Sequence, residues 1–465
     1  AAGAASAAEV KTYATKDVVP VLANKVGPFA NPHETYKYYS LPFCPPSVEQ
    51  RQDHNLGEVL AGDRKVLAKY EVRFRTNVDW RLLCEKTLSQ RDILRLMKAI
   101  EEEYYFEFFV DGLPVWGYIG DVVEDEFLLG QTSRTRHYLY THLHFSLGYN
   151  GDRVVEANVT TNPSKRVELT GRTELDTTFS YSVSWRPVNI PYERRYDRYH
   201  HTSFLPGAFE IHWLSVINSF ILVVVLTAFL AVILMRVLRN DFAEYMSAED
   251  REAAEDESGW KLLHGDVFRV PGQASVLAAV IGAGVHLLLT AFLLLVLSLL
   301  GAFHPTHRGS LLTAAIMLYC LTSVVNGYVS ARLYKQLGGR QWVWNVVMAA
   351  LLFPLPLFVV FMFVNSAAIA HGATAALPFG TVVVVLSLFI LLAFPLSVIG
   401  GIAGHNTSGD LGAPCRTKRV SRQIPAQPWY RGMVVHLLVG GFLPFTAIYV
   451  ELYNVFASVW GHRIY

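Results

Sequence analysis

The sequence is poor in charged residues and has no excess of either sign. Of its 465 residues only 17% are Asp, Glu, Lys or Arg, and the formal net charge is +1. An ordinary soluble domain carries roughly 25% charged residues, and a protein that neutralises a phosphate backbone needs a surplus of Lys and Arg. The composition therefore excludes a disordered chain and makes nucleic acid an unlikely partner.

The sequence also lacks the short motifs of common enzymes. It contains no Walker A loop, HExxH zinc pair, GxSxG elbow or GxGxxG after a strand. His142 and His144 share a strand face with His137 nearby, but no Cys or carboxylate at close spacing completes a metal-ligand set. Solvated histidines on a polar strand face are favoured over a metal site. We therefore expect no catalytic residues, no cofactor and no metal, and the protein is not expected to be an enzyme.

Long apolar runs dominate the second half of the chain. A helix crosses the hydrocarbon core of a bilayer with about 20 mostly apolar residues. Six runs meet this requirement, at about 211–237, 274–300, 310–333, 342–364, 376–400 and 433–460. The expected fold class is mixed, with a β-rich domain over residues 1–210 and an all-α polytopic bundle over residues 211–465 embedded in the lipid bilayer.

The orientation follows from Lys and Arg in the connecting loops, because basic loops stay in the cytoplasm. The first, third and fifth loops are basic, whereas the second holds only Arg308 and the fourth holds no Lys or Arg. The N-terminal domain, called the head below, is therefore predicted to be lumenal or extracellular. Residues Ala1–Ala8 are small and apolar, as expected for the remainder of a processed signal peptide.

The head shows mostly strand periodicity. Apolar and polar residues alternate in Phe179–Arg186 and in Leu139–Leu147, which is typical of half-buried strands. Asp111-Gly112 suits a tight hairpin turn. One helix is expected after Ser89, which can cap it together with Asp92. The head is therefore predicted to be a β-rich sandwich with one helix.

Three residues of the head are candidates for covalent modification. An oxidising lumen permits a disulfide between Cys44 and Cys84, with two free buried thiols as the alternative. Asn158 begins the sequon Asn-Val-Thr and is a candidate for N-glycosylation on the lumenal side.

Polar residues inside the predicted spans are the candidate functional residues of the membrane domain, because burying them in lipid is costly. Glu451 is the strongest candidate among them, because the apolar residues around it in the sequence include no other ionisable side chain. It suits either the proton relay of a transporter or a hydrogen-bonded contact that only holds helices together. The full set is His212, Asn218, His286, Asn326, His436, Glu451 and Asn454.

Small residues recur in the same spans, as in Gly282-Ala283-Gly284, Gly400-Gly401 and Gly440-Gly441. They permit close helix packing, and a surface that accepts the transmembrane helix of a partner needs the same chemistry.

A series of short motifs resembles the nonaspanins, the transmembrane nine superfamily, also called the endomembrane protein 70 family. In the head these are Val26-Gly27-Pro28-Phe29, Glu34-Thr35-Tyr36, Leu41-Pro42-Phe43-Cys44, Leu56-Gly57-Glu58-Val59-Leu60 and Gly62-Asp63-Arg64. Beyond it they include His264-Gly265-Asp266-Val267-Phe268-Arg269, Ala376-Leu377-Pro378-Phe379-Gly380, Gly400-Gly401-Ile402-Ala403-Gly404 and Pro414-Cys415-Arg416-Thr417. The resemblance covers essentially the whole chain.

The resemblance implies residence in Golgi and endosomal membranes. It also implies a role in sorting other membrane proteins, especially cargo with glycine-rich transmembrane helices. The family pattern has nine spans and a cytoplasmic tail with a Lys-x-Asp/Glu retrieval signal, through which coat proteins would bind. This sequence shows six spans and ends at Tyr465, so the last three spans and the tail are expected to be absent from it.

Two functional hypotheses follow. The first is a non-enzymatic escort whose bundle recognises helices in the plane of the membrane. The second is a transporter or channel that uses Glu451. An intramembrane enzyme is the weakest alternative, because Glu451 stands alone among the predicted spans.

Overall fold

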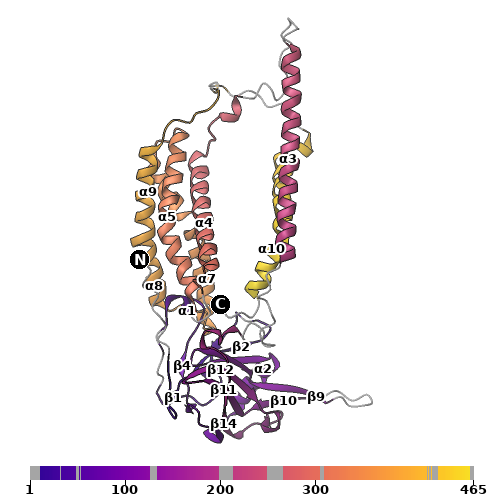
Figure 1. The fold of residues 1–465 in the computed structure, drawn as a ribbon, viewed down its shortest axis with the longest axis vertical. Coiled ribbons are helices and arrows are strands. Elements are labelled where there is room, and N and C mark those ends of the chain that lie inside the picture. The colour runs from indigo at the N-terminus through magenta and orange to yellow at the C-terminus, as the bar shows by residue number, and fades with distance from the viewer. Residues whose placement is uncertain are drawn as a thin grey trace.

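A β-rich head lies at one end of a helical membrane domain (Figure 1). The computed structural model describes residues 11–31, 33–48, 52, 54–125, 134–197, 213–248, 265–303, 308–415, 417, 420 and 428–460. The mixed fold class predicted from the sequence is confirmed: a β-rich N-terminal domain precedes apolar helices that are long enough to span a membrane.

The strands of the head form two larger and two smaller sheets. Their bounds are β1 Val18–Val19, β2 Val21–Pro28, β3 Tyr36–Lys37, β4 Val66–Leu67, β5 Val72–Arg73, β6 Val78–Leu88, β7 Tyr104–Val110, β8 Leu113–Tyr118, β9 Gly120–Asp125, β10 Arg134–Tyr140, β11 His142–Asn150, β12 Arg153–Thr161, β13 Arg166–Glu168 and β14 Leu175–Pro187. One larger sheet has the order β12-β11-β14-β6, with β11 and β14 parallel, and the other has β3-β2-β7-β8 with β4 paired to β2. The smaller sheets are β1-β5 and β13-β10-β9.

An aromatic core joins the two larger sheets. The ring of Tyr70 lies 5.8 Å from that of Phe108 in β7, and 5.1 and 5.3 Å from those of Phe145 in β11 and Tyr181 in β14. All four side chains are buried. Ring pairs at these separations stabilise a core beyond the area they bury, so the strands of the two sheets pack as one unit.

Two local predictions for the head are confirmed. Helix α2 (Gln90–Glu101) begins after Ser89, whose side chain forms a capping box with Asp92. Asp111 and Gly112, with φ of 50° and 80°, form the two-residue turn between β7 and β8, and this left-handed conformation suits Gly and Asp best.

Two strand predictions need correction. The segment Leu139–Leu147 is two strands, because the chain leaves β10 at Thr141 and enters another sheet as β11. In β14 the polar positions Ser180 and Ser182 are buried and not exposed, because the side chains of two histidines on β11 cover that face.

Within the described residues the membrane domain has eight longer helices, and the short helix α1 (Leu56–Leu60) of the head contacts α5. The longer helices are α3 Trp213–Ala248, α4 Ala274–Leu299, α5 Ser310–Gln336, α6 Trp342–Leu351 continued by α7 Pro354–Ala370, α8 Phe379–Leu388 continued by α9 Phe394–Thr407, and α10 Met433–Trp460. A π turn at Phe389–Ala393 joins α8 to α9 just before Pro395, which has no N–H to donate.

Five of the six predicted spans coincide with helices of sufficient length and apolarity. They are Val216–Ala243, Ala274–Leu299, Ser310–Gln336, Trp342–Ala370 and Phe379–Thr407. The fourth extends past its predicted end to Ala370, and in this extension Asn365 is buried with its side-chain oxygen accepting a hydrogen bond from the N–H of Leu377. The sixth prediction lies on α10, whose described apolar stretch Met433–Thr446 is shorter, so that span stays a prediction.

Helices α4 to α9 form one bundle, whereas α3 and α10 contact each other and stand apart from it (Figure 1). No residue from 216 to 243 of α3 is buried.

Candidate functional site at the junction of head and bundle

Two loops of the bundle bind the head. Thr374, between α7 and α8, donates its N–H to the carbonyl of Thr35 over 2.7 Å, and the hydroxyls of the two threonines lie 2.5 Å apart. The neighbouring Ala373 forms a β-bridge with Tyr36. The guanidinium of Arg64 donates to the carbonyl of Ala376 over 2.8 Å. The α7–α8 loop is thus held by backbone and side chains of the head.

The α4–α5 loop approaches the head even more closely. Gly57 in α1 donates its N–H to Oγ1 of Thr313 in α5 over 3.0 Å. A Cβ atom on Gly57 would lie 1.8 Å from the carbonyl oxygen of Gly309, and Gly309 itself has φ of 76°. Gly57 must be glycine because a side chain there would overlap Gly309. Gly309 must be glycine because of the same close contact and because its backbone conformation is left-handed.

A buried charge cluster forms the centre of this junction. Arg308, from the α4–α5 loop, places Nε 3.0 Å from Oδ2 of Asp63 and donates from Nη1 to Oε1 of Glu107 over 3.1 Å. Nζ of Lys25 lies 3.8 Å from both carboxylates. The amide of Asn24 donates to the same two carboxylates over 2.9 and 2.8 Å. The cluster thus places the carboxylates of Asp63 and Glu107 beside the two basic side chains of Arg308 and Lys25.

Burial and neighbouring charge act in opposite directions on Asp63. Burial alone would raise its pKa, but Arg308 and Lys25 outweigh that effect and hold the pKa below the ordinary value. The pKa of Arg308 is raised, because the attraction of Glu107 and Asp63 exceeds the penalty of burial. Asp63 and Arg308 are therefore both charged at neutral pH, and removal of one of them would leave a buried charge unpaired.

The junction brings together motifs that are far apart in the sequence. Thr35-Tyr36, the segment Leu56–Leu60, Asp63-Arg64 and Ala376-Leu377 all belong to the motifs that carry the family resemblance. Sequence reasoning treated Arg308 only as a loop charge and missed Lys25, Asn24 and Glu107. A usable signal was present, because Glu107 interrupts the otherwise apolar strand Tyr104–Val110, and a charge is rarely buried without a partner.

The intramembrane candidates do not converge on one site. His286 and Asn326 are buried and bind backbone carbonyls of neighbouring helices, Tyr319 at 2.9 Å and Ala349 at 3.0 Å. Asn218 is exposed on α3, and the exposed His436 contacts the carbonyl of Gly432 in its own chain segment. His212 lies outside the described residues, as do the side chains of Glu451 and Asn454 on α10.

The structure reveals a polar network in the bundle that the sequence analysis missed. Oγ of Ser330 in α5 donates to Oδ1 of Asn345 in α6 over 2.6 Å, and the amide of Asn345 donates to the carbonyl of Ser275 in α4 over 2.8 Å. Asn345 is fully buried. It lies within a predicted span, so the cost of burying an amide in lipid would have identified it as well.

In the head, Cys44 and Cys84 form a disulfide with 6.2 Å between their Cα atoms. Asn158 lies on β12, half-buried, with its amide 3.1 Å from Oε1 of Glu156, and its glycosylation stays a prediction.

The two histidines of β11 are not solvated. His142 is buried with its ring nitrogens 2.8 and 2.9 Å from the hydroxyls of Ser180 and Ser182, and the half-buried His144 contacts the hydroxyls of Ser182 and Ser184. Burial lowers the pKa of His142 below its ordinary value, and the charges of Lys165 and His144 add to this effect. Among the described residues, no group of three or more His, Cys, Asp or Glu is placed to hold a metal ion.

The small residues divide into two groups. A Cβ on Gly327 of α5 would lie 1.8 Å from the carbonyl oxygen of Ser397 in α9, and one on Gly400 would lie 1.9 Å from that of Val324. These glycines therefore let α5 and α9 pack backbone to backbone. Gly440 and Gly441 of α10 have no described atom within 4 Å of the corresponding position.

A β-rich head bound through a buried charge cluster to a bundle of apolar helices defines a polytopic membrane protein. The family model described as Endomembrane protein 70 matches residues 35–465. Transmembrane 9 superfamily member 2 of Arabidopsis thaliana is 48% identical over 97% of this chain and 76% of its own length. Transmembrane 9 superfamily member 1 of Pongo abelii is 46% identical over 98% of this chain and 76% of its own length. "Putative phagocytic receptor 1b" of Dictyostelium discoideum is 43% identical over 97% of this chain and 76% of its own length. The chain belongs to the transmembrane 9 (endomembrane protein 70) superfamily. No solved structure matches it.

Proposed function

We propose that this protein is a non-enzymatic escort that sorts other transmembrane proteins in Golgi and endosomal membranes, with its head in the lumen. It recognises glycine-rich transmembrane helices of its cargo in the plane of the bilayer. The family relationship establishes a membrane protein, and the name of the Dictyostelium relative describes that protein as a phagocytic receptor. Sorting of cargo helices is the step that we add.

The open glycine pair of α10 carries this proposal. Without a hydrophobic driving force between helices in lipid, association depends on van der Waals contact and on small residues that let backbones approach. Gly327 and Gly400 already serve packing within the bundle, whereas no described atom lies within 4 Å of the Cβ position of Gly440 or Gly441. α10 stands with α3 outside the α4–α9 bundle (Figure 1), so no helix of the described α4–α9 bundle covers this surface, and we propose that a helix of another protein binds there.

The test measures the surface abundance of two reporters that differ only in a glycine-rich or a leucine-rich transmembrane helix. Cells that lack the protein are complemented with the wild type, with Gly440→Leu, or with the control Gly380→Leu. Gly380 is likewise open, but lies on α8 of the bundle. We expect the wild type and the control to restore only the glycine-rich reporter, and Gly440→Leu to fail.

If both reporters or neither respond to the protein, recognition of helices is wrong. The transporter hypothesis would then be tested by flux into proteoliposomes and its sensitivity to Glu451→Gln.

A further inference from the structure

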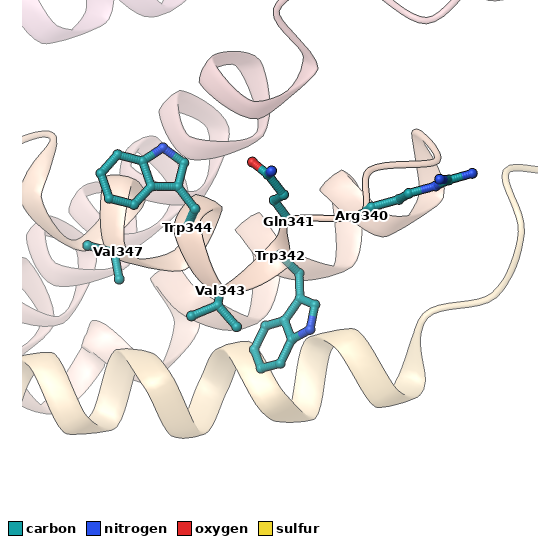
Figure 2. A pocket seen from close by; sticks show the side chains of 6 residues that line it. All are labelled: Arg340, Gln341, Trp342, Val343, Trp344 and Val347. Carbon is teal, nitrogen blue, oxygen red and sulfur yellow. The ribbon is translucent and has the colours of Figure 1, made fainter.

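One cavity lies at the end of the bundle away from the head. Helix α5 begins at the junction, where Thr313 contacts the head, and ends at Gln336. The loop that follows leads into α6 at Trp342. The cavity, of about 380 Å³, is lined by Arg340, Gln341, Trp342, Val343, Trp344 and Val347 (Figure 2). Its volume is within the range of small-molecule sites.

The lining is amphipathic. Val343 and Trp344 are 57% and 64% exposed, although both are apolar. Trp342 is held in place by stacking on His405 of α9, with ring centroids 4.8 Å apart. In Figure 2 the two indoles leave the start of α6 in different directions, and Arg340 extends from the preceding loop. One end of the cavity is thus cationic and the other apolar.

The charge at this site has no acidic counterpart nearby in the sequence. No Asp or Glu occurs from residue 267 to residue 409. Arg332 contacts the hydroxyl of Tyr328, and Lys335 donates to the carbonyl of His405 over 2.7 Å. Arg340 is exposed, with no hydrogen bond or ion pair to any residue within the described ranges.

We propose that this cavity binds an anionic phospholipid. The guanidinium of Arg340 binds the headgroup phosphate, for which its planar fork of N–H donors is suited. Trp342 and Trp344 lie at the depth of the headgroups, where tryptophan is enriched in membrane proteins. The acyl chain lies over Val343 and Val347. A free phosphate would not use this apolar part of the lining, so the ligand is a lipid of the leaflet on this side.

The test uses the whole protein in detergent and measures binding of dioleoyl phosphatidylserine and dioleoyl phosphatidylcholine by native mass spectrometry. We expect the wild type to prefer phosphatidylserine, and Arg340→Gln to reduce phosphatidylserine affinity about tenfold, the effect of losing one charge-assisted hydrogen bond. Phosphatidylcholine binding should not change. The matched control Arg332→Gln removes an equal charge from the same end of the bundle and should change the affinity less than twofold.

Three results would overturn the proposal. Equal losses in Arg340→Gln and Arg332→Gln would show general attraction to a basic surface. Equal binding of both lipids by the wild type would show that no anionic site exists. Displacement of phosphatidylserine by soluble glycerophosphoserine at similar concentration would show that the headgroup alone is the ligand.

Trp344→Ala should weaken phosphatidylserine binding without affecting thermal stability, because its side chain is largely exposed.

Discussion

Arg308 extends from the α4–α5 loop and ends between the carboxylates of Asp63 and Glu107 in the head. Asp63 is fully buried and Glu107 almost so. Charges in such a place are stable only as a set, because each desolvated ion needs its partners.

We therefore expect Arg308→Gln to destabilise the attachment of the head by about 3–5 kcal/mol. Hydrogen exchange at Thr35, Thr374 and their neighbours would report this loss. The double variant Arg308→Gln with Asp63→Asn should recover part of it, since the remaining Glu107 can pair with Lys25. The exposed Arg332→Gln serves as control. Unchanged exchange in Arg308→Gln would contradict the role of the cluster.

His142 gives the head a pH dependence of known sign. Its pKa in the folded head is lowered, so the unfolded chain binds more protons than the folded one below about pH 6.5. The stabilisation is therefore complete above about pH 6.5 and decreases as the pH falls toward the folded pKa. Amides of β11 and β14 should exchange faster at pH 5.5 than at pH 7, after correction for intrinsic rates. His142→Gln should reduce this difference, whereas His436→Gln should leave it unchanged.

At the scale of elements, the features that depend on residues close together in the sequence could be predicted from the sequence. The capping box of α2, the Asp111-Gly112 turn and five apolar spans were all visible, because each depends on residues near one another in the chain. The division of Leu139–Leu147 between two sheets was not, because the sheet that a strand joins depends on distant partners. The buried serines of β14 escaped prediction for the same reason, since His142 and His144 cover them from another strand.

Two glycines, one at the contact of α5 with α9 and one at an open position of α4, test whether close helix packing requires glycine. We expect Gly327→Ala to destabilise the bundle by about 1–3 kcal/mol, because its Cβ would overlap the carbonyl of Ser397. Gly284→Ala in α4, where no described atom lies within 4 Å, should be neutral or stabilising by up to about 1 kcal/mol. Thermal unfolding in detergent would compare the two. Equal changes in the unfolding temperature of the two variants would show that the close contact of α5 with α9 does not require glycine at position 327.

At the scale of the whole molecule, the junction joins the β-rich head to the helical bundle. The individual motifs of the junction could be recognised in the sequence, but their meeting could not. Thr35 and Thr374 are 339 positions apart, and no periodicity connects them. The glycines were likewise recognised as a class, and only the structure separates those packed against a neighbouring helix, such as Gly327 and Gly400, from open ones such as Gly284 and the pair on α10.

The most direct test of the proposed escort function is contact between α10 and a cargo helix. A photo-crosslinking residue would be placed at position 440, and at position 380 as control, in cells that express the glycine-rich or the leucine-rich reporter. We predict strong crosslinking from position 440 to the glycine-rich reporter only, and little from position 380 to either. Equal crosslinking of both reporters, or none from position 440, would contradict recognition of cargo helices by α10.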